Sequence, residues 1–169
     1  MLKIAYTMAH GRGELDMLLT ELAEHLHAQG VRTRGIVQKN TGCETEGRCD
    51  MDVQVLPDGP VIRISQYLGK GARGCRLDPD AMAQAISEVA RTLDTPYDLF
   101  LLNKFGKEEG EGRGFRNLLA EAAAGGAVII AGTNPLNADK FKEFSGGEAV
   151  CVEAEIDALL RWYKAVSAS

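Results

Sequence analysis

Short apolar runs alternate along the chain with stripes of apolar residues at helical spacing. The runs predict strands, and those rich in Leu, Ile and Val predict strands buried on both faces of a sheet. They lie at residues 2–8, 31–38, 98–103 and 127–131. The stripes predict amphipathic helices. They comprise Leu15, Leu18, Leu19, Leu22 and Leu26, then Met82, Ala85, Ile86, Val89 and Leu93, and then Phe115, Leu118, Leu119 and Ala122.

Turn and cap residues delimit several of these elements. Gly30 follows the first stripe, where a glycine commonly ends a helix. Asp78 and Pro79 precede the second stripe, which predicts an Asp N-cap with proline at the first helical position. The turn Pro57-Asp58-Gly59 predicts a β-hairpin over residues 52–65. Two further helices are predicted near residues 138–144 and 153–166.

The alternation of strands and helices predicts an α/β fold. We expect a mainly parallel sheet with helices on both faces and the β-hairpin as an insertion, all in a single domain over residues 1–169. Ligands of such folds bind at the carboxyl ends of the strands. The glycine-bearing loops 9–13, 104–114 and 132–134 should therefore gather at one edge of the sheet, and the loop 66–77 is a candidate to join them.

Composition and charge narrow the classes of function. The net charge of −5 argues against general nucleic-acid binding, which needs a basic surface, but it leaves room for a local basic pocket. The chain has no apolar run near the roughly 20 residues that a membrane helix needs, and it starts with a strand-like segment rather than a signal peptide. These features predict a cytoplasmic protein without membrane insertion, and they are compatible with a homo-oligomer.

The first glycine loop, Ala9-His10-Gly11-Arg12-Gly13, leads from a predicted strand into a predicted helix. This context favours anion binding, because free backbone N–H groups and the helix dipole face the ligand. A phosphate-binding P-loop reads G-x-x-x-x-G-K-[ST]. Here Glu14 or Leu15 stands where the lysine would fall, and no Ser or Thr follows to bind magnesium. An ordinary strand-to-helix turn is the alternative interpretation.

The second loop spans residues 63–78 and holds four cations against one carboxylate. Its glycines would let the backbone approach a ligand closely, and arginine forks match tetrahedral oxyanions with paired hydrogen bonds. This pattern favours an anion site over the alternative of a solvated basic loop. The hypothesis assigns the main cationic surface to Arg63, Lys70, Arg73 and Arg76, with backbone N–H groups from Gly69, Gly71 and Gly74.

The third loop follows the strand predicted at 98–103. Asn103 stands where a phosphate-hydrolysing α/β protein carries an acid that helps to hold magnesium. An asparagine can donate and accept hydrogen bonds but supplies no charge. Lys104, Lys107 and Arg113 add positive charge to this loop, and three glutamates oppose them.

The cysteines and histidines give weaker evidence for a functional site. Five residues lie between Cys43 and Cys49, a poor match to zinc-knuckle spacing that favours simple loop thiols. Cys75 lies between two arginines just before a predicted helix, which would suit a reactive thiolate or a soft metal ligand, with a packing role as the alternative. His10 is the histidine that lies in a candidate loop.

These motifs resemble a bacterial family of unknown function. The resemblance rests on residues 63–66 and 71–78, on Asn103-Lys104-Phe105-Gly106-Lys107 and on residues 109–114. It implies a link to molybdenum metabolism, because members of that family are often encoded near molybdate-transport or molybdenum-enzyme genes. The layout also resembles the small P-loop nucleoside triphosphatases related to the thermophilic phosphatase group, with both catalytic places altered. That second resemblance implies a P-loop-like fold.

The leading hypothesis is a non-hydrolytic protein that binds a small anion: molybdate, tungstate, phosphate or a nucleotide. One alternative is a divergent nucleoside triphosphatase or phosphotransferase that uses a substituted lysine, Lys70 or Lys104. Another is a soft-metal or redox module built from Cys43, Cys49 and Cys75. The candidate anion-binding residues are Gly11, Arg12, Gly13, Arg63, Ser65, Lys70, Arg73, Gly74, Arg76, Asn103, Lys104, Lys107 and Arg113.

Overall fold

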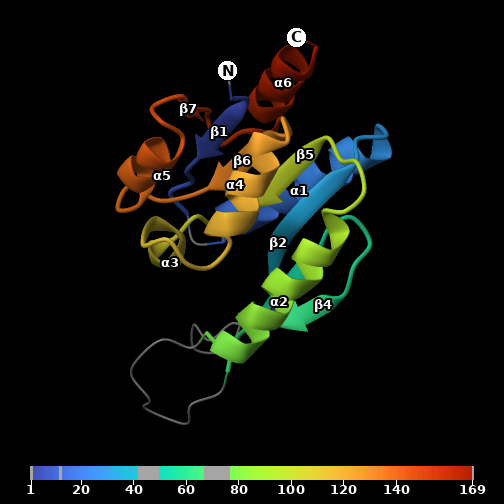
Figure 1. Cartoon of the computed structure of the whole chain (residues 1–169), viewed down its shortest axis with the longest axis vertical. Helices are drawn as coiled ribbons and strands as arrows, with labels where there is room; N and C mark the ends of the chain where they lie inside the picture. Colours follow the sequence, from blue (N-terminus) through green and yellow to red (C-terminus); the bar gives the residue numbers. More distant parts are fainter. Residues whose placement is uncertain (1, 12, 42–49, 67–76, 169) are drawn as a thin grey trace.

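The structure is a computed structural model that describes residues 2–11, 13–41, 50–66 and 77–168 (Figure 1). Strands and helices alternate along most of the chain. In order, the elements are β1 (Ile4–Thr7), α1 (Glu14–Ala28), β2 (Thr33–Thr41), β3 (Asp50–Val55), β4 (Val61–Arg63), α2 (Pro79–Thr92), β5 (Leu99–Leu102), α3 (Lys107–Gly110), α4 (Arg116–Ala124), β6 (Val128–Gly132), α5 (Ala138–Phe144), β7 (Val150–Cys151) and α6 (Ile156–Ser167).

The strands form one sheet in the order β4-β3-β2-β5-β6-β1-β7. Strands β2, β5, β6, β1 and β7 pair in parallel, whereas β3 and β4 form an antiparallel hairpin at the β2 side. Figure 1 shows this hairpin with α2 at one end of the row of strands and β7 at the other. Because β1, β5 and β6 run in the same direction, the loops that follow them leave the same carboxyl edge. The predicted mainly parallel α/β fold and its hairpin insertion are confirmed.

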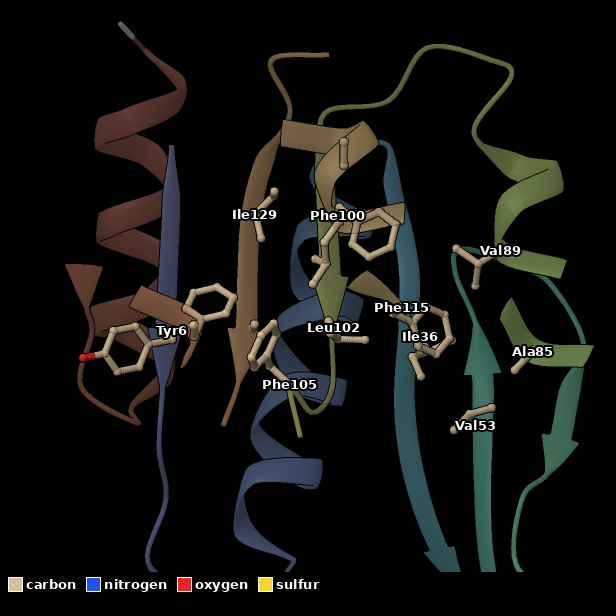
Figure 2. Packing of buried hydrophobic residues seen from close by; sticks show 14 of the residues in the cluster. Tyr6, Ile36, Val53, Ala85, Val89, Phe100, Leu102, Phe105, Phe115 and Ile129 are labelled. Carbon is tan, nitrogen blue, oxygen red and sulfur yellow. The ribbon is translucent and has the colours of Figure 1, made fainter. Parts of the chain in front are cut away.

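Two apolar layers cover the sheet because successive strand residues point to opposite faces. Leu99 and Leu101 of β5 pack with α1 and α6 on one face. Phe100 and Leu102 pack with α2, α4 and α5 on the other. Figure 2 shows this second layer, in which Phe105 lies just beyond the end of β5 between Tyr6 and Leu102. The predicted helices on both faces are therefore present, and α1, α2 and α4 bury the predicted apolar stripes.

Most helix and strand boundaries lie close to the predicted ones. Asp78 caps α2, since its Oδ1 accepts hydrogen bonds from the backbone N–H groups of Asp80 and Ala81 at 3.0 and 3.4 Å. Gly30 follows the end of α1 with a left-handed φ of 86°. Two short elements, α3 and β7, were not predicted. Among the described residues, none of the helices combines the length and the apolar character needed to cross a membrane.

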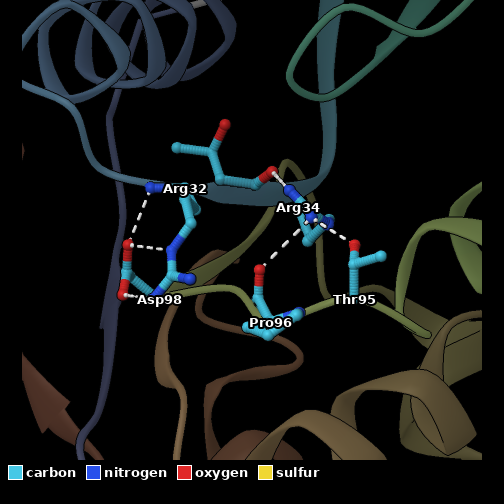
Figure 3. A network of polar contacts seen from close by, with 6 residues as sticks. Arg32, Arg34, Thr95, Pro96 and Asp98 are labelled. Atoms are coloured by element: carbon cyan, nitrogen blue, oxygen red, sulfur yellow. Dashed lines mark hydrogen bonds and ion pairs between the residues drawn. The ribbon is translucent and has the colours of Figure 1, made fainter.

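Two arginines at the amino edge of the sheet contact residues that precede β5 (Figure 3). Arg32 binds Asp98, next to the start of β5, and Arg34 binds the end of α2 and the loop after it. The Arg32 guanidinium donates from Nε and Nη2 to the two carboxylate oxygens of Asp98 at 3.1 and 2.9 Å, and the Arg32 backbone N–H donates to Asp98 Oδ2 at 2.8 Å. Arg34 donates to the Thr92 carbonyl and the Thr95 hydroxyl, both at 2.9 Å or less. This edge lies opposite the candidate loops, so we assign it a structural role.

Low pH should weaken the ion pair between Arg32 and Asp98. The hydrogen bond from the Arg32 side chain lowers the pKa of Asp98 below its ordinary value of 3.8. A carboxyl group whose pKa is lowered by folding contributes stability at neutral pH that is lost as pH falls through the folded-state pKa. We expect Asp98→Asn to reduce the free energy of unfolding by about 1 kcal/mol at neutral pH, a figure that allows for solvent screening of this half-exposed pair.

Urea unfolding at about pH 7 and about pH 3 tests this expectation, because the difference between parent and variant should narrow as pH falls below the ordinary pKa of Asp98 towards its lowered folded-state pKa. Asp139→Asn is the control, since Asp139 is exposed and pairs only loosely with Lys142 at 3.8 Å. A loss for Asp98→Asn that is equal at both pH values would contradict the assigned ion pair.

Candidate functional site

Asn103 joins three elements at the carboxyl edge. It directly follows β5 and is 2% exposed. Strand β2 continues past the last residue that pairs with β5, and the Asn103 Oδ1 accepts the backbone N–H of Gln38 at 2.8 Å in that continuation. The Asn103 Nδ2 donates to Asp16 Oδ1 of α1 at 2.6 Å. The amide therefore uses both its acceptor and its donor.

Asp16 is the carboxylate at the centre of this contact. Its second oxygen accepts a hydrogen bond from Asn40 Nδ2 at 2.7 Å. The Oδ1 of Asn40 in turn accepts from Gln38 Nε2 at 3.0 Å. We refer to Asp16, Gln38, Asn40 and Asn103 as the amide clamp. It fixes the first turns of α1 to the ends of β2 and β5. Of its four residues, the sequence had indicated Asn103 alone as a site residue.

In the loop from β1 to α1, two hydrogen bonds join Gly11 to Glu14. The backbone N–H of Gly11 donates to Glu14 Oε2 at 3.2 Å, and the Glu14 N–H donates to the Gly11 carbonyl at 3.3 Å. A Cβ on Gly11 would lie 2.1 Å from Glu14 Oε1, so glycine is the residue that admits the carboxylate. Gly13 precedes α1 with a left-handed φ of 79°. We call this arrangement the Glu14 seat.

The residues that follow Gly13 supply none of the groups that a working P-loop provides. Glu14 is the first residue of α1 and stands where the lysine follows the second glycine. Leu15 takes the place of the magnesium-binding Ser or Thr, and its side chain lies against β6, where a Cβ on Gly132 would be 2.8 Å from Leu15 Cδ2. The first turn of α1 therefore carries two carboxylates at its positive dipole end.

The loop after β5 is built around Glu109. This side chain is 6% exposed, and its two oxygens accept the backbone N–H groups of Gly106 and Phe115, each at 3.0 Å. A Cβ on Gly114 would lie 1.9 Å from Glu109 Oε2, so this glycine permits the close approach. Glu109 thus orders residues 106–115. The sequence alone did not show which of the three neighbouring glutamates would have this role.

The four predicted cations that the structure describes differ in their partners. Lys104 and Lys107 are exposed, and within the described ranges no carboxylate pairs with either of them. Arg113 pairs with Glu108 at 2.7 Å and with Glu111, and the Glu108 hydrogen bond raises the pKa of Arg113.

Arg63 and Ser65 make contacts within the hairpin. Arg63 pairs with Asp52 at 3.0 Å and with Asp50 at 3.5 Å, and the Asp52 hydrogen bond raises the pKa of Arg63. The Ser65 hydroxyl accepts the Met51 backbone N–H at 3.0 Å. These contacts compensate much of the charge that Arg63 and Arg113 could offer to an anion.

The chain was compared with known families and proteins. The family model described as "Protein of unknown function (DUF2478)" matches residues 4–162. The chain belongs to this family. The family assignment agrees with the expected resemblance to a family of unknown function.

The chain is also similar to one curated protein and to one protein of known structure. A curated protein of Bradyrhizobium diazoefficiens, "Molybdenum import ATP-binding protein ModC 2", is 32% identical over 169 residues, which cover 98% of this chain but 18% of the relative. The chain thus spans less than a fifth of that relative's length. A crystal structure of THEP1 from the hyperthermophile Aquifex aeolicus aligns with a TM-score of 0.52 at 18% identity, covering 98% of this chain and 96% of that one. This similarity shows that the two chains share an α/β fold.

Several predicted site residues of this DUF2478 protein lie outside the described residues. They are Arg12, Lys70, Arg73, Gly74 and Arg76 among the anion candidates, and Cys43, Cys49 and Cys75 among the thiols. Their roles stay predictions. His10 is exposed, Cys151 is a free exposed thiol, and the part of the chain that the structure describes contains no group of three His, Cys, Asp or Glu residues placed to hold a metal ion.

Proposed function

We propose that this DUF2478 protein is a non-hydrolytic anion-binding protein that binds an oxyanion or a nucleotide at the carboxyl edge of its sheet and serves molybdenum metabolism. The observation that carries the proposal is the pair of substitutions at this edge. Glu14 stands in the lysine position of the P-loop, and Asn103 stands in the position of the strand-end acid.

These substitutions argue against phosphoryl transfer. Catalysis of that reaction depends on positive charge and magnesium to neutralise the transferred phosphoryl group. Glu14 brings negative charge instead, while Leu15 and Asn103 remove the hydroxyl and carboxylate that would hold the metal. Steady turnover of ATP or GTP should therefore fall far below about 1 s⁻¹, the low end for kinases.

The role in molybdenum metabolism is supported by the curated relative. This relative is named as an ATP-binding protein of molybdenum import, and a segment similar to this chain makes up a minor part of its length. A segment that forms part of such a protein is expected to serve the same system, and we extend that expectation to this chain. Molybdate and tungstate are accordingly the first anions to test, with phosphate as the tetrahedral reference.

Lys104 and Lys107 are the described cations best placed to bind the anion. Both are exposed on the loop that leaves the carboxyl end of β5, and neither forms an ion pair with a carboxylate of the described residues, although the pKa of Glu108 is lowered by its hydrogen bond to Arg113 and by the charge of Lys107. Replacing both with alanine should weaken binding of the preferred anion by about a hundredfold or more if both lysines contact it, since each hydrogen bond to a charged group contributes roughly 1.5–3 kcal/mol. Added salt should weaken binding as well.

Isothermal titration calorimetry with molybdate, tungstate, phosphate, ATP and GTP tests the proposal, together with a hydrolysis assay. Lys164→Ala is the matched control, because Lys164 is an exposed lysine near the end of α6 at the opposite edge. Binding that is lost in Lys104→Ala/Lys107→Ala and kept in Lys164→Ala would support the site. If none of the five compounds binds the parent protein, the proposal fails. Turnover that disappears on Lys104→Ala would favour a divergent nucleoside triphosphatase instead.

A further inference from the structure

Strand β4 lies at one end of the sheet, and within the described sheet it pairs with β3 on one side only. On either side of its middle residue, Ile62, the Pro60 carbonyl and the Ile64 N–H form hydrogen bonds with β3 at 3.0 and 2.9 Å. Because backbone groups alternate in direction along an antiparallel ladder, those of Ile62 also face β3. The N–H and C=O groups of Val61 and Arg63 therefore face outward. We call Val61–Arg63, with these outward groups, the β4 edge.

The chain itself adds a short extended segment just beyond the β4 edge. Ser65 and Leu77 form an antiparallel bridge. The Asp78 N–H then donates to the Ile64 carbonyl at 2.7 Å. The chain enters α2 directly afterwards, so this pairing ends before it reaches β4. This side of the hairpin can thus hold an antiparallel segment, and the β4 edge is the part for which the described residues provide none.

A cavity adjoins the β4 edge. Figure 1 shows α2 alongside β4, and an open cavity of about 450 Å³ lies between the strand and the first turns of the helix. Val61 is 56% exposed, which places an apolar side chain next to the outward backbone groups. Side chains of an added strand alternate between the two faces of a sheet. Every second side chain of a docked segment would therefore point toward the cavity, whose polar lining comes from Arg63, Asp78, Asp80 and Gln84.

Carboxylates outnumber cations around the β4 edge. Arg63 pairs with Asp52 at 3.0 Å and with Asp50 at 3.5 Å, so two carboxylates already offset its single charge. Asp78 and Asp80, on the α2 side, form no ion pair with any lysine or arginine of the described residues. Complementary charge guides and orients docking, so a lysine or an arginine is the side chain that suits this cavity.

A second copy of the chain would suit the β4 edge less well. If two β4 strands paired antiparallel with Ile62 opposite Ile62, the hairpin turn of each copy, which carries Asp58, would meet the end of the other copy that carries Asp78 and Asp80. Like charges brought together oppose such a pairing, and the net charge of −5 adds to the repulsion. The charges thus favour a basic partner over self-association.

We infer that the β4 edge docks an extended basic segment of another protein as an added antiparallel strand. Main-chain hydrogen bonds to Val61 and Arg63 would supply the affinity, and a lysine or arginine beside Asp78 and Asp80 would supply the specificity. Because β4 has three residues, the interface is small and binding should be weak and reversible. Strands β3 and β2 separate this edge from β5 and its loop, so the inference does not depend on the proposed anion site.

A heptapeptide of alternating lysine and valine is the probe, and its glutamate–valine counterpart is the charge control. In ¹⁵N–¹H spectra, the lysine peptide should shift the Val61 and Arg63 resonances and slow their amide exchange, while the Gly30 resonance stays unchanged. Asp80→Lys should weaken binding about tenfold, because it replaces an attraction with a repulsion of similar size. Asp94→Lys is the matched control, since it changes the net charge equally at an exposed position beyond the other end of α2.

Backbone N-methylation of the probe tests strand addition without altering the protein. Methylating either the lysine or the valine nitrogens blocks alternate N–H groups, so one set should abolish binding and the other should leave it intact. The inference is wrong if both methylated peptides bind like the unmodified probe, if the glutamate peptide binds as tightly as the lysine peptide, or if neither peptide binds. Val61 and Arg63 resonances that shift with protein concentration alone, together with a dimer in sedimentation, would identify a second copy as the occupant and overturn it as well.

Discussion

Asn103→Asp should destabilise the protein by about 3 kcal/mol at neutral pH, although it restores the acid that related folds carry at this strand end. The substitution replaces the Nδ2 donor with an oxygen, which would face Asp16 Oδ1 at the present contact distance of 2.6 Å. Two facing carboxylates repel unless they share a proton. The loss should therefore be largest at neutral pH and shrink in acid.

A second substitution in the clamp should recover most of that loss. In Asp16→Asn/Asn103→Asp, the new amide at 16 can donate to the new carboxylate at 103 and still accept from Asn40, while the carboxylate keeps accepting the Gln38 N–H. Urea unfolding of the single and double variants forms a double-mutant cycle. Asn117→Asp, at an exposed position on α4, is the control and should change stability by less than about 0.5 kcal/mol. An unrescued double variant would show that the clamp does not work through this hydrogen bond.

The fold could be predicted from the sequence where periodicity is strong. The buried runs of β5 and β6 and the stripes of α1 and α2 each span enough residues to distinguish a strand from a helix. The two-residue β7 carries no such pattern. The four-residue α3 lies in a stretch of glycines and charges, and it is held by local hydrogen bonds to Glu109 from the backbone N–H groups of Gly106 and Phe115. It is too short to show a helical period, so the pattern of apolar residues did not reveal it.

The site was predictable at single positions but not as a set of contacts. The predicted strand that ends at Asn103 placed this residue at the carboxyl edge, and the P-loop pattern left either Glu14 or Leu15 at the lysine position. The Asp16 contact spans 87 positions of sequence, so pattern reasoning on each loop could not reveal it. Three glutamates were expected to oppose the cations of this loop, but the sequence alone did not show that Glu108 and Glu111 pair with Arg113.

Strands β2 and β5 pack closely against each other at Gly35. Gly35 lies in the middle of the sheet opposite Leu101, with a left-handed φ of 104°. A Cβ at this position would be 1.9 Å from the Leu101 carbonyl oxygen, which is a backbone atom and cannot rotate away. We expect Gly35→Ala to lower the free energy of unfolding by about 3 kcal/mol, the sum of backbone strain and overpacking.

Gly30→Ala separates these two contributions. Gly30 also has a left-handed φ, 86°, but no described atom lies within 4 Å of a Cβ built there. This control should therefore show the strain alone, about 1 kcal/mol. Chemical unfolding monitored by the fluorescence of Trp162 gives both values. Equal losses in the two variants would mean that β2 and β5 separate to accommodate the methyl group. A much larger loss for Gly35→Ala would show that the central strand pair is fixed, as the Asn103 contact between the same two strands requires.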